Sequence, residues 1–267
     1  MPSAAPYPAT VPPFRKHSPT NHPRYAGWEA AGLRWLAAAT PDGGAEVVEV
    51  LDVSGPTLVM ERLTPSPPTR KAAGEFGERL ARTHAAGATA YGTGPDGWEG
   101  NGYFGPSHDV LDLALGAQST WGAHWARQRL RPIAATCAAA GTLDPATIAD
   151  LHRVADRCEA GDFDTGDPPA RVHGDLWSGN LMWTEQGAVL IDPAAHGGHR
   201  ELDLAMLALF GAPHLGEIVT AYESVAPLAA EWRDRVHLHQ LYALAVHAHL
   251  FGSGYAVPTA SASRRYR

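Results

Sequence analysis

The segment from Arg171 to Met206 constrains the fold of this chain most strongly, because it combines a hairpin pattern with acidic residues on both sides. It reads RVHGDLWSGNLMWTEQGAVLIDPAAHGGHRELDLAM. Two short apolar runs flank the polar tetrapeptide TEQG, which predicts a β-hairpin. Asp175 and Asn180 precede this hairpin, and Asp192 follows it. A hairpin returns the chain to its starting edge, so Asp192 is expected beside Asp175 and Asn180.

Two carboxylates and an amide at one edge of a small sheet match what phosphoryl transfer requires. The transition state spreads negative charge over the phosphoryl oxygens, so catalysis depends on positioning and on a metal ion that neutralises this charge. Asp175 is the candidate general base. Asn180 and Asp192 are candidate ligands for Mg²⁺, which prefers hard oxygen donors. Alternatively, these side chains make only turn hydrogen bonds in the loop, but the complete pattern favours a kinase.

The rest of the chain divides at the proline-rich stretch 64–68. This stretch is the predicted boundary between a first lobe over residues 1–64 and a second lobe over residues 65–267. In the first lobe, the spacing of apolar residues predicts strands over 14–16, 45–53 and 57–63 and a helix over 28–39. In the second lobe it predicts helices over 72–84, 121–140 and 145–158, and two closing helices over 201–210 and 231–251. The predicted fold class is therefore α+β, with a small mixed lobe followed by a mostly helical lobe.

Composition excludes several classes of protein. The net charge of −7 argues against a nucleic-acid partner, which would need a basic face. The apolar runs are too short to span a bilayer, and the proline-rich start has no apolar core of a secretory signal. Cys137 and Cys158 lie apart, so they are predicted to be buried free thiols in a reducing, cytoplasmic environment.

Two other features are expected to be structural. The histidines of the last predicted helix do not have the spacing of a known metal motif, so we expect structural or exposed side chains; they are His237, His239, His247 and His249. The basic end, Arg264 to Arg267, is expected to be a solvated tail.

The strings HGDLWSGN and VLIDPAAHGGHRELDLAM closely resemble the fructosamine-kinase (ketosamine-3-kinase) family. This family belongs to the aminoglycoside-phosphotransferase branch of the protein-kinase-like fold. Related aminoglycoside kinases carry proline where this chain has Trp177, so the motif points to the fructosamine group. The resemblance covers the chain from Phe14 onward, with weaker landmarks in GWEGNGYFG, RQRLRP and LYALAVHAHLFGSGY. It implies a two-lobed architecture that uses ATP and Mg²⁺.

The resemblance assigns roles in the first lobe. Lys16 matches the strand lysine that contacts the nucleotide phosphates, and Glu29 matches the helix glutamate that pairs with it. The backbone of Glu61, Arg62 and Leu63 matches the hinge that hydrogen-bonds adenine.

The resemblance also assigns roles in the second lobe. It gives Asp175 the proton-acceptor role, makes Asn180 and Asp192 the metal ligands, and suggests that Asp203 braces the catalytic loop. The implied reaction phosphorylates a sugar hydroxyl of a ketosamine, and the acceptor is a free amine adduct or a glycated protein lysine.

Three further residues are candidates for the substrate side. Trp177 either stacks on a sugar or fills the lobe interface. His196 and Arg200 either line the substrate pocket or anchor the loop.

One part of the family pattern is not found before Lys16. The fifteen residues that precede it contain no glycine, whereas the family has a glycine-containing nucleotide loop there. The first lobe is therefore expected to be truncated. Either the true start lies upstream, or the chain is a degraded or atypical kinase with weak nucleotide affinity. Two alternatives stay open: a kinase for another hydroxylated amine, such as an aminoglycoside, and a pseudokinase that binds a ligand or partner.

Overall fold

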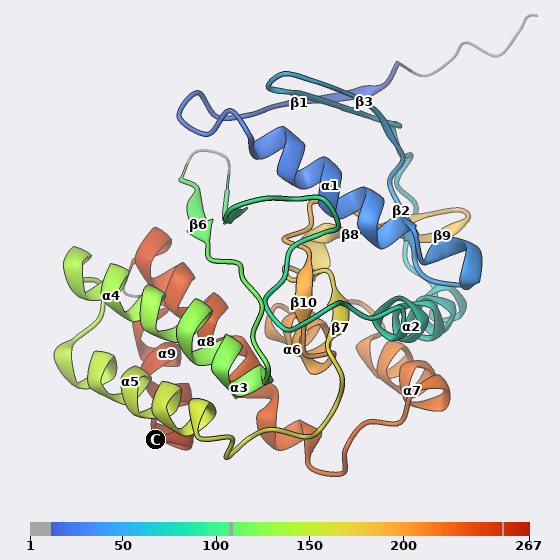
Figure 1. Ribbon diagram of the computed structural model, residues 1–267. Helices are drawn as coiled ribbons and strands as arrows, with labels where there is room; N and C mark the ends of the chain where they lie inside the picture. Colours follow the sequence, from blue (N-terminus) through green and yellow to red (C-terminus); the bar gives the residue numbers. More distant parts are fainter. Residues whose placement is uncertain (1–11, 107–108, 253) are drawn as a thin grey trace, which may run out of the picture.

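The first lobe is a small antiparallel sheet with one helix beneath it. The computed structural model describes residues 12–106, 109–252 and 254–267. The sheet has the order β1-β4-β3, with β1 at Phe14–His17, β3 at Val50–Ser54 and β4 at Thr57–Met60. Helix α1 (Tyr25–Ala37) packs against this sheet (Figure 1). The predicted turn between β3 and β4 is confirmed, and Gly55 adopts a positive φ of 56° in it.

The second lobe is mostly helical. Its helices are α2 (Arg70–Ala85), α3 (Trp121–His124), the π-helical turn η2 (Trp125–Leu130), α4 (Arg131–Ala140), α5 (Pro145–Glu159), α6 (Glu201–Leu209), α7 (Leu215–Val225), α8 (Trp232–Phe251) and α9 (Ala256–Tyr266). The side chain of Asp144 accepts from the amides of Ala146 and Thr147, which confirms the predicted start of α5. Helix α8 packs against α4, α6 and α9, so it forms the centre of this lobe (Figure 1).

Helix α7 packs closely along α2. A Cβ added at Gly77 of α2 would lie 2.2 Å from the carbonyl oxygen of Ile218 in α7. Only glycine therefore allows the two backbones to approach this closely. This contact fixes α2, which carries the buried His84.

The predicted hairpin is confirmed as β8 (Leu181–Thr184) and β9 (Gly187–Leu190). A two-residue strand of the first lobe, β2 (Glu46–Val47), pairs in parallel with β9, so the two lobes share a sheet. Two further sheets have two antiparallel strands each. One pairs β7 (Ala170–Val172) with β10 (His196–Gly198). The other pairs β5 (Gly102–Phe104) with β6 (Leu111–Leu113). Short 3₁₀ turns, η1 (Thr40–Asp42) and η3 (Ser178–Asn180), precede β2 and β8.

Several sequence predictions of the fold were wrong. The strand expected over 45–53 is divided into β2 and β3, which join different sheets. The strand expected over 57–63 ends at Met60. The helix expected over 121–140 has a π-helical turn in its middle, and α7 and α9 were not predicted.

The basic end of the chain is not a solvated tail. It belongs to α9, where Tyr266 is buried and donates a hydrogen bond to the carbonyl of Asp234. Arg267 forms an ion pair with Asp150 of α5 at 3.1 Å. Other predictions were confirmed: Cys137 and Cys158 are buried free thiols, and none of the described helices is long and apolar enough to cross a membrane. The truncation expected before Lys16 concerns residues that lie largely outside the described part of the chain.

Candidate active site

The hairpin brings the three predicted residues of the catalytic centre together. The Nδ2 of Asn180 donates to the Asp175 carboxylate at 3.2 Å and to the carbonyl oxygen of Asp192 at 3.3 Å. The amide of Ile191 donates to the Asn180 carbonyl at 3.1 Å, which joins the two ends of the hairpin. Asp192 has a positive φ of 51°, an uncommon conformation for a residue other than glycine. The expected proximity of Asp175, Asn180 and Asp192 is confirmed.

Lys16 links the first lobe to this centre. Its Nζ lies 2.8 Å from Glu29 and 3.1 Å from Asp192. Burial alone would lower the pKa of Lys16, but the two carboxylates raise this pKa above its ordinary value. Lys16 is therefore a fixed positive charge between helix α1 and the hairpin.

Asp175 has the electrostatic environment of a proton acceptor. Burial raises its pKa to about 7, the hydrogen bond from Asn180 opposes this shift, and the nearby charges of Asp192 and Asp203 add to it. A carboxylate with a pKa near the working pH can both accept and release a proton efficiently. This environment is compatible with the general-base role that the sequence predicts for Asp175.

Asp203 holds the loop that carries Asp175. Its carboxylate accepts from the backbone amides of His173 at 2.7 Å and Gly174 at 3.0 Å, and from the Nε2 of His84 at 3.0 Å. His84 in turn accepts at Nδ1 from the Tyr222 hydroxyl, at 2.8 Å. Asp203 is fully buried, and these donors stabilise its charge. These hydrogen bonds hold the loop of His173 to Asp175 in place, as expected for the bracing role of Asp203.

Two adjoining pockets meet at Asp192. A cleft of about 320 Å³ is lined by the polar side chains of Lys16, Asp175, Asn180 and Asp192. Its other lining residues are mainly aromatic or apolar, and they are Tyr25, Phe104, Gly105, Pro106, Trp177, Val246, His247, Leu250 and Phe251. A second pocket of about 240 Å³ is lined by Glu61, Arg62 and Leu63, together with Phe14, Val48, Met60, Met182, Ile191 and Asp192. The predicted hinge residues therefore surround a largely apolar pocket beside the acidic cleft.

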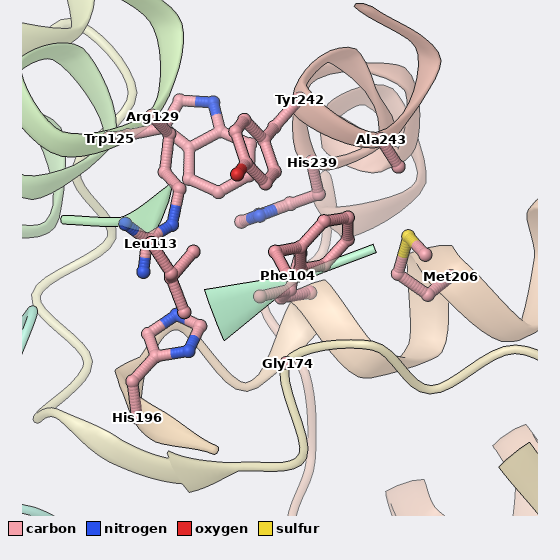
Figure 2. A pocket seen from close by; sticks show the side chains of 11 residues that line it. Phe104, Leu113, Trp125, Arg129, Gly174, His196, Met206, His239, Tyr242 and Ala243 are labelled. Carbon is pink, nitrogen blue, oxygen red and sulfur yellow. The ribbon is translucent and has the colours of Figure 1, made fainter. Parts of the chain in front are cut away.

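Trp177 lies at the cleft, whereas His196 and Arg200 do not. The Trp177 ring lines the cleft, packs against Phe210 at a centroid distance of 5.8 Å and is 38% exposed. His196 lies in a small enclosed cavity beside Arg129 and donates from Nδ1 to the carbonyl of Ala194 at 2.8 Å (Figure 2).

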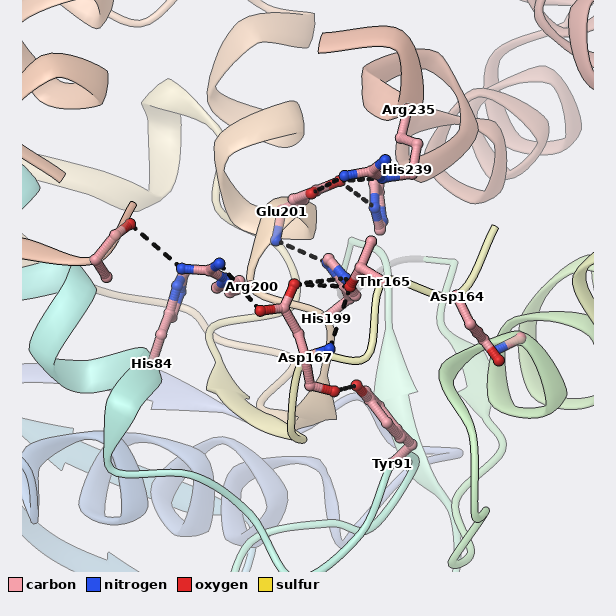
Figure 3. A network of polar contacts seen from close by, with 12 residues as sticks. His84, Tyr91, Asp164, Thr165, Asp167, His199, Arg200, Glu201, Arg235 and His239 are labelled. Atoms are coloured by element: carbon pink, nitrogen blue, oxygen red, sulfur yellow. Dashed lines mark hydrogen bonds and ion pairs between the residues drawn. The ribbon is translucent and has the colours of Figure 1, made fainter. Parts of the chain in front are cut away.

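Arg200 is an anchor between segments of the second lobe. It pairs with Asp167 at 3.0 Å and donates to the carbonyls of Ala226 and Pro227 at 3.3 and 2.9 Å (Figure 3). Of the two interpretations of His196 and Arg200, the structure supports loop anchoring and not a place in the cleft.

One of the α8 histidines belongs to a buried group with possible metal ligands. Nitrogen and oxygen atoms of His199, Glu201 and His239 lie within 4.8 Å of one another. Arg235 already binds Glu201 through two hydrogen bonds, at 2.5 and 2.9 Å (Figure 3). A cation at this place would have to compete with the guanidinium, so Arg235 serves as the charge partner of Glu201.

The donor set at the hairpin fits a hard cation. The Asn180 amide directs its nitrogen to Asp175 and to backbone oxygen, which leaves its side-chain oxygen available. The Asp192 side chain is 44% exposed toward the cleft and contacts Lys16 through one oxygen. An amide oxygen and a carboxylate together are ligands suited to Mg²⁺.

Sequence reasoning missed most of the aromatic and apolar residues that line the cleft. Tyr25, Phe104, His247 and Phe251 line the cleft but were not predicted to do so. Two of the weaker landmarks, GWEGNGYFG and LYALAVHAHLFGSGY, contain three of these residues and were the available signal.

Comparisons with known proteins agree with this geometry. A family model for fructosamine kinase matches residues 14–265. The crystal structure of a "putative fructosamine-3-kinase" from Thermobifida fusca has a TM-score of 0.85 and 42% identity, and the match covers 95% of this chain and 85% of that chain. A "Probable ketoamine kinase" of Escherichia coli is 32% identical over 208 residues, which are 75% of this chain and 65% of that protein. This chain thus spans slightly less than two thirds of that relative's length.

A more distant structure shares the fold alone. The APH(2″)-IIa chain of a gentamicin complex has a TM-score of 0.57 at 11% identity, over 91% of this chain and 82% of that chain. The chain therefore has the two-lobed kinase-like fold, and it belongs to the fructosamine kinase family.

Proposed function

We propose that this chain transfers the γ-phosphoryl group of ATP to a sugar hydroxyl of a ketosamine. The observation that carries the proposal is the convergence of Asp175, Asn180, Asp192 and Lys16 on one cleft that adjoins the hinge pocket. The family and the E. coli relative named a ketoamine kinase support the same reaction class. In this family the product is a 3-phosphate that separates from its amine, so the implied role is deglycation repair.

Each residue has a part in the proposed transfer. Asp175 accepts the proton of the acceptor hydroxyl as its oxygen bonds to the γ-phosphorus, and ADP departs with the bridging oxygen of the broken bond. Lys16 neutralises phosphate charge, and Glu29 keeps it in place. Asn180 and Asp192 would hold Mg²⁺, which supplies charge neutralisation on the phosphates when bound. Glu61 to Leu63 would position adenine in the second pocket.

The cleft is suited to a sugar that carries an amine. Aromatic rings such as Trp177 and Phe251 can pack on the C–H faces of a sugar, while the acids attract a positively charged amine. The motif HGDLWSGN resembles that of the fructosamine group, and the match to the fructosamine kinase family also favours ketosamines over aminoglycosides as acceptors. The acceptor can be a free amine adduct or a glycated lysine of a protein.

The test measures ADP release with Mg-ATP and one of three acceptors: ribulosyl-lysine, fructosyl-lysine or an aminoglycoside. We expect turnover with a ketosamine, and loss of that turnover in Asp175→Asn. Turnover with the aminoglycoside alone would contradict the substrate class. Binding of Mg-ATP without turnover on any acceptor would contradict the enzymatic proposal and favour a pseudokinase.

A further inference from the structure

Tyr25 lies at the first position of helix α1, and its side chain is part of the lining of the cleft. Its ring lies 5.6 Å from the Nζ of Lys16, in a cation–π arrangement, and 5.8 Å from the ring of Tyr103. It lines the same cleft as Asp175, Asn180 and Asp192. The side chain therefore lies among the charged residues of the proposed transfer site. The motif HGDLWSGN does not include Tyr25 and assigns it no role.

The hydroxyl of Tyr25 is weakly engaged. It donates to the carbonyl of Gly105 at 3.4 Å, which is longer than a typical O–H···O hydrogen bond. Burial raises the pKa of Tyr25 to about 12; Lys16 opposes the shift, and Glu29, Asp192 and Asp175 add to it. The phenol thus keeps its proton at any working pH, and it can exchange the long bond to Gly105 for a stronger acceptor.

The cleft needs neutral donors as well as cations. Phosphoryl transfer develops charge on oxygens that are stabilised by preorganised hydrogen-bond donors. Among the described residues that line the cleft, Tyr25 carries the only hydroxyl. The Asn180 amide nitrogen is already committed to Asp175 and to backbone oxygens. Tyr25 can therefore supply a donor on the side of the cleft where Lys16 lies.

We propose that the hydroxyl of Tyr25 donates a hydrogen bond to the terminal phosphate of bound ATP and to the phosphoryl group during transfer. The inference rests on the proposed kinase function and adds a phosphate-contacting residue to it. It differs from a purely structural role, in which Tyr25 would only join α1 to the β5–β6 segment through Gly105.

The decisive measurement is the ratio of two affinities, determined calorimetrically in Mg²⁺ on the full chain. The ligands are ADP and the non-hydrolysable ATP analogue adenylyl imidodiphosphate, which differ by the terminal phosphate. Tyr25→Phe removes the hydroxyl and keeps the ring that packs on Lys16 and Tyr103. We expect the preference for the ATP analogue over ADP to fall about 10-fold, the effect of losing one hydrogen bond to a charged group.

Tyr103→Phe is the matched control. Tyr103 lies on β5 beside Tyr25, but it does not line the cleft, so the same loss of a hydroxyl should leave the ratio unchanged. Both variants should unfold at the wild-type temperature.

The outcomes separate the two proposals. An unchanged ratio in Tyr25→Phe would overturn the assignment even if turnover fell, because loss of turnover alone fits the bridge to Gly105. If the wild-type chain bound neither nucleotide, the kinase proposal would fail, and the role of Tyr25 with it. If both nucleotides bound and only the ratio stayed constant, the Tyr25 assignment alone would fail.

Discussion

The loop that carries Asp175 has two sides, and their acids are stabilised in opposite ways. On the buried side, Asp203 receives two backbone amides and His84, and these donors hold its pKa below the ordinary value. On the cleft side, Asp175 receives one side-chain donor from Asn180, and burial raises its pKa to about 7. The carboxylate that braces the loop therefore differs from the proposed general base, and the proposed base is held by fewer hydrogen-bond donors.

The largest expected effect comes from Asp175→Asn. A general base contributes about 10²–10⁴ in rate, so turnover should fall by that factor. A carboxyl whose pKa is raised in the folded state costs stability above its unfolded pKa, so the neutral amide should leave the free energy of unfolding at pH 7.5 unchanged or larger. Steady-state kinetics and urea unfolding of the same preparation check both parts. If Asp175→Asn instead lost much of the unfolding free energy, Asp175 would stabilise the fold as Asp203 is expected to, and the contrast between the two acids would be wrong.

Asp203→Ala should affect stability most. The substitution leaves the amides of His173 and Gly174 and the ring of His84 without their buried acceptor. Breaking a buried charge network of this kind costs about 3–5 kcal/mol. Urea unfolding should show this loss, and Asp203→Asn, which keeps one acceptor oxygen, should lose less. If Asp203→Ala unfolded like the wild type, the brace would not be a stabilising element.

The buried histidines predict a pH dependence. Burial and Arg129 lower the pKa of His196 to about 3, whereas the unfolded side chain titrates near its ordinary value. Below the unfolded pKa the unfolded state binds more protons, so stability should fall as pH falls from 7 to 5.5. His196→Asn retains a donor for the Ala194 carbonyl, and it should reduce this loss by about 1 kcal/mol.

The exposed His152 provides the control for that experiment. His152→Asn makes the same substitution at an exposed position, so it shows how much of any change in slope is due to the substitution itself. Equal slopes for the wild type and His196→Asn would show that His196 does not contribute to the pH dependence.

The smallest effect is expected at the surface. Arg70 of α2 pairs with Glu217 of α7, but its side chain is 79% exposed. Exposed ion pairs contribute about 0–1 kcal/mol, so Arg70→Ala should shift the unfolding free energy by less than about 1 kcal/mol. If Arg70→Ala lost as much unfolding free energy as Asp203→Ala, the exposed pair with Glu217 would be worth as much as the buried contacts of Asp203. Burial would then not explain the difference between them.

The predictions from sequence succeeded where local pattern decides the structure. The hairpin and the positions of Asp175, Asn180 and Asp192 follow from strand alternation around one turn. The direction in which a single side chain points cannot be derived from such a local pattern. His196 and Arg200 follow Asp192 closely in the chain, but β10 pairs with β7, and the two side chains anchor buried segments away from the cleft.

Elements with a weak apolar pattern, or with a pairing partner far along the chain, could not be predicted from the sequence. Helix α9 buries small polar residues, Thr259 and Ser263, so it lacks a clear apolar stripe. The cleft wall from His247 to Phe251 lies in a helix buried on much of its surface, where the apolar pattern does not single out the residues that face the acids. The strand β2 has two residues, and its partner lies far along the chain.

This last pairing has a consequence for synthesis on the ribosome. Glu46 emerges early, but its partner Val189 follows about 140 positions later. At ordinary elongation rates of about 5–20 residues per second, β2 waits on the order of ten seconds for β9. During that interval β1, β3 and β4 have all been synthesised, but the first lobe cannot yet be joined to the hairpin between Asn180 and Asp192. The site is therefore assembled late in translation, after most of the second lobe has been made.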